Sequence, residues 1–233
     1  VQDCNHQHSG GYLGGRYLSS KWDGMFAEYF KVPDVDLNVA KIPDGVSLEA
    51  AALVGDMVTT GFHGVELADV KFGDRVCVIG IGPVGLMSVV GCVLRGAAEI
   101  YAVGHRPVTR ELAMQYGATA TIDYHDGPIV EQVMKLTGGQ QIEKVIIAGG
   151  EPTVFNDALA LVKYTGTVAN LAGHGRTELL LPIYTNESGF GFCAHKTVTG
   201  GLCPGGRRRI ERLMGMVKAG RFEPEKLITH RFY

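Results

Sequence analysis

The feature that most constrains the fold is a run of 19 uncharged residues from Val76 to Leu94. Its length approaches that of a membrane-spanning helix. Four glycines and Pro83 lie within the run, and a proline in a helix interior removes a backbone hydrogen bond. We therefore interpret the run as a buried strand, a tight turn and a helix.

The turn has the pattern G-x-G-x-x-G and consists of Gly80, Ile81, Gly82, Pro83, Val84 and Gly85. In dinucleotide-binding folds the first glycine permits the turn, the second lets the backbone approach a pyrophosphate, and the third lets the helix pack on the strand. The pyrophosphate binds unpaired N–H groups at the positive end of the helix. The pattern predicts dinucleotide binding. The alternatives are a glycine-rich turn without a ligand and a site for another nucleoside.

From about residue 70 the sequence alternates short β-branched runs with helical segments, which is typical of βαβ units. The predicted strands cover residues 75–79, 99–103, 120–123, 144–148 and 167–171. The predicted helices cover 84–94, 108–116, 129–136 and 152–162. The sequence thus predicts the α/β class, with a Rossmann-type, doubly wound parallel sheet.

The first 59 residues have a different pattern and are assigned to another domain. The alternation in Met25–Val32 suits an antiparallel strand. Near the other end, Arg207, Arg208 and Arg209 begin a predicted amphipathic helix. We interpret these arginines as a solvated basic face, with an anion contact as the alternative.

Charge and cysteine content exclude several classes of protein. The 22 basic and 24 acidic residues give a formal charge of −2, so no basic surface indicates nucleic acid or an anionic membrane as a partner. The five cysteines lie far apart without a C-x-x-C pair, which argues against a disulfide framework or a cysteine zinc knuckle. A reducing, cytoplasmic location is expected.

The end of the second predicted strand bears on which dinucleotide binds. An NAD site places an acidic residue there to bind the ribose 2′-hydroxyl. This chain has Gly104, His105 and Arg106 instead, and a guanidinium suits a 2′-phosphate. The sequence therefore favours NADP. The alternative is that Arg106 only begins the next helix before Pro107.

Asp56 is the acidic residue of a largely apolar segment, Ala50–Gly64. A buried carboxylate needs a partner, so we expect Asp56 either to cap a helix through the N–H of Val58 or Thr59, or to bind a cation. His63 and His8 are possible metal ligands by residue type. Nothing in their spacing connects them with Asp56.

The chain resembles the zinc-dependent medium-chain alcohol dehydrogenases, in particular the microbial NADP-linked secondary alcohol dehydrogenases. The resemblance is carried by residues 56–68, 77–87, 195–196 and 200–207. It implies a cytoplasmic homotetramer that transfers a hydride between a small secondary alcohol, or its ketone or aldehyde, and NADP with the help of Zn²⁺. It also implies a partial, mainly β, GroES-like catalytic domain at 1–59, a Rossmann domain at 60–202 and a return segment at 203–233.

The resemblance assigns roles residue by residue. It implies that Asp56 is the carboxylate ligand of the catalytic zinc and that the turn Gly80–Gly85 binds phosphate. Gly104, His105 and Arg106 match the stretch that holds the 2′-phosphate, where the family usually has serine in place of His105. Tyr124 matches a tyrosine at the adenosine end, and Leu171, Ala172 and Gly173 match backbone beside the nicotinamide.

Two departures from the family's pattern bear on activity. The family's other zinc ligands, a Cys and a His-Glu pair, lie in a stretch that would precede Val1, so we expect a fragment that is inactive by itself. Arg16 stands where the family often has tryptophan, which leaves the alcohol open. The alternatives are a zinc-independent quinone or enoyl reductase of the same superfamily, or an inactive cofactor-binding fragment.

Overall fold

The computed structural model describes residues 27–32, 34–175, 178 and 195–232. These residues divide into two compact units. One contains the described residues up to Thr59 together with Cys203–Glu225, and the other contains those from Thr60 to Leu202 together with residues 226–232.

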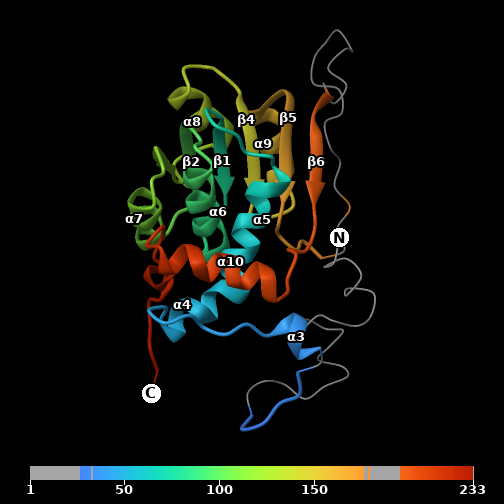
Figure 1. Ribbon diagram of the computed structural model, residues 1–233. Coiled ribbons are helices and arrows are strands. Elements are labelled where there is room, and N and C mark those ends of the chain that lie inside the picture. Colours follow the sequence, from blue (N-terminus) through green and yellow to red (C-terminus); the bar gives the residue numbers. More distant parts are fainter. Residues whose placement is uncertain (1–26, 33, 176–177, 179–194, 233) are drawn as a thin grey trace. The chain divides into compact units, whose positions relative to one another are not determined.

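The second unit is built on a six-stranded sheet in which every strand pairs in parallel. The strand order is β3-β2-β1-β4-β5-β6, so the chain winds outward from β1 in one direction and then from β4 in the other (Figure 1). This is the doubly wound order of Rossmann-type folds. The strands are β1 (Arg75–Ile79), β2 (Glu99–Val103), β3 (Ala120–Ile122), β4 (Ile142–Ile147), β5 (Val162–Asn170) and β6 (Thr197–Gly200).

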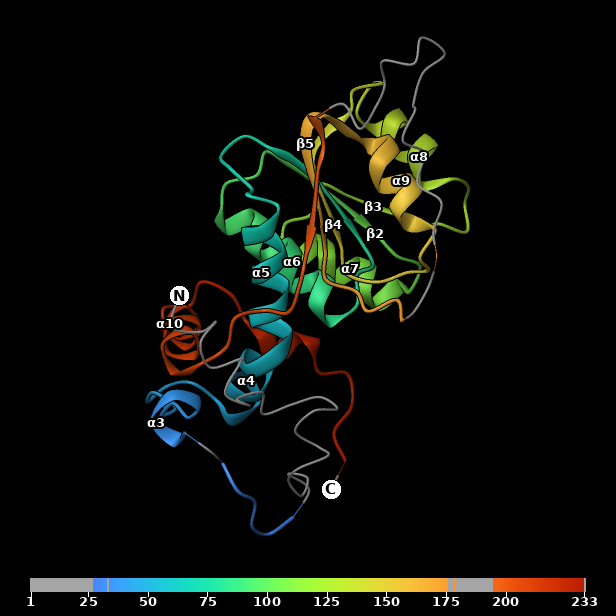
Figure 2. The same ribbon diagram turned by 90° about the vertical axis from the view of Figure 1, so that its right-hand side faces the viewer.

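Helices cover both faces of this sheet (Figure 2). One face packs against α5 (Thr59–Leu67), α6 (Pro83–Leu94) and α7 (Pro107–Gln115). The other packs against α8 (Ile129–Leu136) and α9 (Val154–Leu161). Because alternate residues of a strand point to opposite faces, Val76 and Val78 of β1 join the first core, and Cys77 and Ile79 join the second.

The predicted fold class is confirmed for this sheet, and the interpretation of Val76–Leu94 as strand, turn and helix is confirmed by β1 and α6. Several boundaries differ from the prediction by one or two residues, and the start of β5 differs by five. Helix α9 begins at Val154, because Pro152 and Thr153 form a turn before it, and β5 begins at Val162, five residues early. Strand β6 was not predicted, because four residues, two of them threonine, carry too little pattern.

A network of charges joins three strands at the amino end of the sheet. Glu143 of β4 accepts hydrogen bonds from Arg75 of β1, at 3.2 Å from Nε, and from Lys163 of β5, at 2.9 Å. Its side chain is 15% exposed. Burial alone would raise the pKa of Glu143, but the hydrogen bonds from Lys163 and Arg75 outweigh it and lower the pKa to about 2.

In the first unit, α4 (Leu48–Leu53) continues into a π-helix, η1 (Val54–Val58). The unit also contains α3 (Val35–Asn38) and α10 (Arg207–Lys218). The short 3-10 helix η3 (Pro224–Leu227) crosses the boundary between the units. Ser47 caps α4, because its hydroxyl accepts a hydrogen bond from the N–H of Ala50.

Two of the three arginines at the start of α10 make contacts that the interpretation as a solvated face did not include, while Arg208 is exposed as that interpretation expects. Arg209 donates to the hydroxyl of Thr59 at 2.5 Å and to its carbonyl at 3.0 Å. Arg207 donates to the carbonyl of Val39 at 2.6 Å. These bonds fasten α10 to segments about 150 positions earlier, a use that sequence spacing does not reveal.

The strand predicted for Met25–Val32 is wrong in its described part. Residues 27–32 form a bend and irregular chain, and Tyr29 is 89% exposed. A strand needs a neighbour to pair its backbone groups, and no described strand pairs with this segment. The GroES-like character of residues 1–59 stays a prediction. Among the described residues, no helix has the length and apolar content to span a membrane.

Candidate dinucleotide-binding site

The glycine turn lies at the carboxyl end of β1. Gly80 has a φ of +91°, a conformation that residues with a side chain rarely adopt. A Cβ at this position would also lie 2.7 Å from the backbone nitrogen of Gly149, which follows β4. The first glycine of the pattern is therefore required by the turn and by its neighbour.

Gly85 and Gly82 serve different purposes in this turn. A Cβ at Gly85 would overlap the carbonyl oxygen of Gly80, so the third glycine lets α6 pack against the turn. At Gly82 a Cβ would meet one described atom within 4 Å, a guanidinium nitrogen of Arg106 at 3.9 Å. The turn is thus tightly packed at Gly85 and open at Gly82.

The start of α6 offers backbone donors at this opening. Gly82 is the N-cap residue, and Pro83, which has no N–H, follows it. The first intrahelical bond runs from the N–H of Leu86 to the carbonyl of Gly82, at 2.9 Å. The N–H groups of Val84 and Gly85 have no partner within the helix, and no described side chain caps it. Such a helix start suits an anion.

The end of β2 forms one side of the opening. A Cβ at Gly104 would overlap the side chain of Ile81, which is buried, so Gly104 lets the turn lie against β2. His105 and Arg106 follow Gly104, and Arg106 is the N-cap residue of α7. The structure therefore brings Arg106 to the glycine turn, 24 positions from Gly82, and places no acidic side chain at the end of β2.

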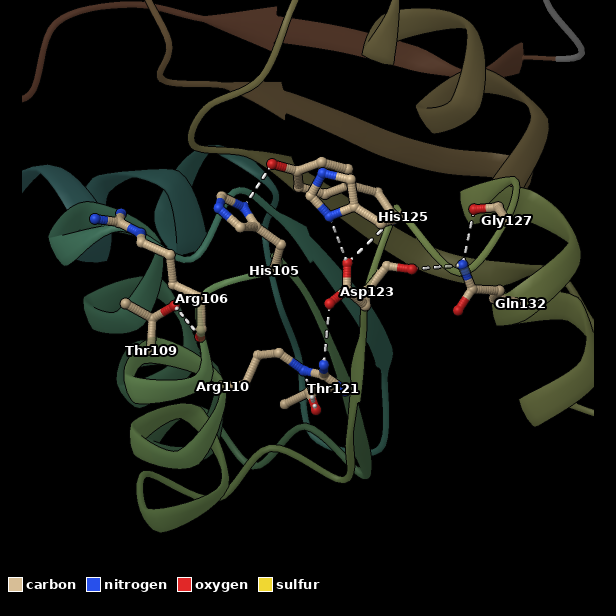
Figure 3. A network of polar contacts seen from close by, with 10 residues as sticks. His105, Arg106, Thr109, Arg110, Thr121, Asp123, His125, Gly127 and Gln132 are labelled. Atoms are coloured by element: carbon tan, nitrogen blue, oxygen red, sulfur yellow. Dashed lines mark hydrogen bonds and ion pairs between the residues drawn. The ribbon is translucent and has the colours of Figure 1, made fainter.

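Arg106 and Arg110 differ in what their guanidinium groups contact. Arg110 pairs with Asp123 at 3.1 Å and donates to the hydroxyl of Thr121 at 3.2 Å, which ties α7 to β3. The Arg106 guanidinium makes no hydrogen bond or ion pair within the described part of the chain. Figure 3 shows it directed away from the Asp123 network. Arg106 is the cation at the turn that is available to a ligand.

Tyr124 and His105 lie together, from the ends of neighbouring strands. The Tyr124 hydroxyl is 2.5 Å from Nδ1 of His105, and the two rings meet edge to face with centroids 5.2 Å apart. The ring of His125 is 5.1 Å from that of His105. Both predicted residues therefore face the same space, although 19 positions separate them.

Asp123 organises the loop that carries Tyr124, and sequence reasoning missed it. Its carboxylate accepts hydrogen bonds from the N–H and the ring of His125, both at 3.0 Å. The N–H of His125 is the main cause that lowers the pKa of Asp123; burial opposes it, and the His125 ring and Arg110 add to it. Gln132 supports the loop by donating to the carbonyls of Asp123 and Gly127 (Figure 3).

The three residues predicted beside the nicotinamide follow β5. The N–H of Leu171 bonds to the carbonyl of Ile147 at 2.8 Å, which continues the sheet by one residue. Asn170 then holds Ala172 at both backbone groups, at 3.2 Å to its N–H and 3.0 Å to its carbonyl. A Cβ at Gly173 would meet no described atom within 4 Å. This segment is ordered but open, as a backbone contact with a ligand requires.

Asp56 does not have the environment that the sequence suggested. It is exposed, and it lies in the middle of η1 between the fully buried Val54 and Val58. The expected burial and the expected N-cap position are both wrong, because helical structure runs on from Leu48 and turns Asp56 to the outer face. A π-helical turn is often associated with functional residues.

The described residues contain no group of three or more His, Cys, Asp or Glu side chains that could hold a metal. His63, considered a possible ligand, instead lies 3.4 Å from Glu66. His8 and Arg16 lie outside the described residues. Within the described part of the chain there is no complete metal site, and the role of Asp56 as a metal ligand stays a prediction.

Comparison with known proteins identifies the family. The profile of the zinc-binding dehydrogenases matches residues 83–218, which is more than half of the chain. The chain belongs to this family. The NADP-dependent isopropanol dehydrogenase of Thermoanaerobacter brockii is 52% identical over 232 residues, covering 100% of this chain and 65% of that protein. The enzyme of the same name from Clostridium beijerinckii is 49% identical over 233 residues, 100% of this chain and 66% of that one.

Solved structures of zinc-binding dehydrogenases and their relatives support the fold. The zinc-dependent alcohol dehydrogenase 2 of Streptococcus pneumonia matches with a TM-score of 0.80 and 28% identity, covering 97% of this chain and 64% of that one. The alcohol dehydrogenase TADH of Thermus sp. ATN1 matches with a TM-score of 0.75 and 28% identity, over 89% and 59% of the two chains. This chain spans about two thirds of the length of such relatives.

Proposed function

We propose that the complete protein is an NADP-dependent secondary alcohol dehydrogenase, which transfers a hydride between a small secondary alcohol, or its ketone or aldehyde, and NADP. The observation that carries the proposal is the 52% identity, across the whole chain, with an enzyme named NADP-dependent isopropanol dehydrogenase. The cytoplasmic location and the homotetramer stay predictions. The alcohol itself stays open.

We propose that the coenzyme binds along the carboxyl ends of the strands. In this proposal the N–H groups of Val84 and Gly85 and the open face at Gly82 receive the pyrophosphate. Arg106 binds the 2′-phosphate, with His105, Gly104 and Tyr124 around it. The geometry of the turn supports this fit, because the guanidinium lies at its opening and has no described partner.

The nicotinamide end would lie along the segment after β5. Leu171, Ala172 and Gly173 present backbone there, and Asn170 holds that backbone in one conformation. NADP supplies the hydride acceptor when it is bound. The contribution of this chain is to bind and orient the coenzyme, since a fixed geometry lowers the entropic cost of the reaction.

Zinc does not fit the described residues as a complete site. A catalytic zinc has three protein ligands and an open position, and the described residues offer Asp56 without two further ligands beside it. We therefore derive no step through the metal. We propose only that Asp56 is one of its ligands, which the resemblance implies and the exposed position on a π-helical turn permits.

The coenzyme half of the proposal is tested by Arg106→Ala. Loss of a charged contact with the 2′-phosphate should weaken NADPH binding about 100-fold, and NADH binding less than about threefold. Fluorescence titration of the complete protein with both coenzymes measures this. Arg110→Ala is the matched control, because that guanidinium is already paired with Asp123. Equal losses for NADPH and NADH in Arg106→Ala would remove Arg106 from phosphate recognition.

The metal half is tested by Asp56→Asn in the complete protein. The variant should hold less zinc and oxidise isopropanol slowly, with NADPH affinity nearly kept, since asparagine is a poorer zinc ligand. Metal analysis and steady-state kinetics give both quantities. Full zinc content with full activity in Asp56→Asn would rule out this role, and wild-type activity that survives chelation would favour a zinc-independent reductase.

A further inference from the structure

His105 is the titratable side chain directly beside Arg106, and its ring is held in place. The Tyr124 hydroxyl contacts Nδ1 at 2.5 Å, and two aromatic rings pack edge to face against the imidazole. The register of β2 and β3, which pairs Val103 with Ile122, brings the two loops together. The contact thus depends on the sheet, and it fixes one ring nitrogen while leaving the other, Nε2, for a ligand.

The contact with Tyr124 is compatible with both charge states of the imidazole. A tyrosine hydroxyl can donate to a neutral Nδ1 or accept from a protonated one, so the ring gains a proton without moving. In the neutral form that accepts at Nδ1, the hydrogen is on Nε2, so Nε2–H can already bond to a phosphate oxygen. Protonation adds a positive charge to the ring, which strengthens that hydrogen bond to the anion. Histidine is the side chain whose charge changes between pH 5 and 8.

The charges around His105 leave a place for an added anion. On its own loop Arg106 is positive, and on α7 Arg110 is positive and paired with Asp123. On the loop after β3, the carboxylate of Asp123 is already paired with His125 and Arg110. Asp126 of the same loop is exposed. The other titratable groups of this loop are Tyr124 and His125. The glycine turn carries no titratable side chain. A doubly charged phosphate at Arg106 would therefore stabilise a proton on His105.

We propose that His105, positioned by Tyr124, is a second and proton-dependent ligand of the coenzyme 2′-phosphate, so that preference for NADP over NAD weakens as pH rises. The inference rests on the proposed function and goes beyond it. Arg106 contributes a charge that is constant with pH. His105 makes part of the discrimination depend on the proton concentration, because binding the phosphate and binding the proton strengthen each other reciprocally.

The test measures proton uptake on binding. Calorimetric titration of the complete protein with NADP and with NAD, in buffers of different ionisation enthalpy, gives the protons taken up by each complex. Near pH 7.5 the NADP complex should take up about 0.5 proton more than the NAD complex. The ratio of the two affinities should fall about fivefold between pH 7.0 and 8.5, where a phosphate monoester with a second pKa of about 6 is already doubly charged.

His105→Gln is the decisive variant, because glutamine keeps a polar side chain but cannot gain a charge. It should abolish the extra proton uptake and flatten the affinity ratio, and a cooperative thermal transition like that of the wild type would show that the variant is folded. His125→Gln is the matched control from the neighbouring ring, and it should keep the extra proton uptake because its partner is Asp123.

Two outcomes would overturn the inference, and they are distinguishable. If His105→Gln keeps the proton uptake of the wild type, or His125→Gln loses it, His105 is not the responsible group, although NADP recognition by Arg106 stands. If the wild type binds NADP no better than NAD at any pH, the proposed function fails and this inference fails with it.

Discussion

The two ends of the parallel sheet are built from opposite kinds of contact. At the amino end, Arg75, Glu143 and Lys163 meet from three different strands and satisfy one another. At the carboxyl end, the described residues do not use the donors at the start of α6, the N–H groups of Val84 and Gly85, or the guanidinium of Arg106. Paired charges stabilise the fold, whereas unused donors are available to a ligand. The same strands thus provide stability at one end and a site at the other.

Among the substitutions that test the difference between the two ends, Gly85→Ala should have the largest effect on stability and on NADPH affinity. The added Cβ would overlap the carbonyl oxygen of Gly80 and push α6 away from the turn. We expect the free energy of unfolding to fall by about 3 kcal/mol and NADPH affinity to fall at least about 100-fold. Urea denaturation and fluorescence titration measure the two effects.

Gly215→Ala is the control for that variant, because Gly215 also lies within a helix but is exposed, and a Cβ added there would meet no described atom within 4 Å. Alanine there should leave coenzyme binding unchanged and stabilise the protein by up to about 1 kcal/mol. Similar losses in the two variants would show that packing against the turn is not the cause.

Glu143→Gln acts on the amino end alone. It should lower the free energy of unfolding by about 2 kcal/mol at pH 7 and leave NADPH affinity unchanged. The folded pKa of about 2 lies below the ordinary value of 4.5, so the carboxylate stabilises the fold above pH 4.5 and loses this effect as pH falls toward 2. The difference between wild type and variant should therefore narrow in that range. Urea titrations at pH 7, 4 and 3 measure this difference in the free energy of unfolding. A difference that stayed constant would contradict the stabilising role of the Glu143 carboxylate.

Asn170→Ala tests whether the segment after β5 is held as part of the site. Without the amide, the backbone of Ala172 loses both of its bonds to that side chain. We expect a stability loss of about 1 kcal/mol and an NADPH affinity about threefold weaker. NADPH titration and urea denaturation of the variant and the wild type measure both quantities. A loss of stability without any loss of NADPH affinity would show that Asn170 does not hold this segment as part of the site.

The smallest effect is expected for Asp69→Asn, at the same end of the sheet as Glu143. The pKa of Asp69 is lowered mainly by its hydrogen bond with Lys71, but both side chains are exposed, and solvent screens such pairs. Asparagine also tolerates the φ of +52° at this position. The thermal midpoint should not change measurably; a clear drop would mean that exposed pairs stabilise this end as well.

Local patterns predicted the parts of the site that consist of consecutive residues. The strand, turn and helix from Arg75 to Leu94 follow from glycine spacing, because Gly80 has a positive φ and Gly85 packs against the carbonyl of Gly80. The missing acidic residue after β2 was also visible in the sequence. The roles assigned to these residues stay proposals, while the arrangement of β1, the turn and α6 is observed.

Contacts between distant segments were not predictable. Nothing in the spacing joins Arg209 to Thr59, or Asp123 to Arg110 and His125 as a support for Tyr124. The error over Asp56 has the same origin: an apolar neighbourhood in sequence indicated burial, but only the helix phase determines which side chains point inward. Strand β6 was missed because an edge strand of four residues is defined by its partner.

The sequence by itself determined the α/β class, the glycine turn and the presence of a guanidinium after the second strand, because these depend on steric and chemical properties of neighbouring residues. Only the tertiary structure decided that Arg106 reaches the turn, that Tyr124 holds His105, and that two cations share one carboxylate at the amino end. The reason is physical: parallel strands bring residues from separate parts of the chain to one edge, and which of them meet is set by strand order and register.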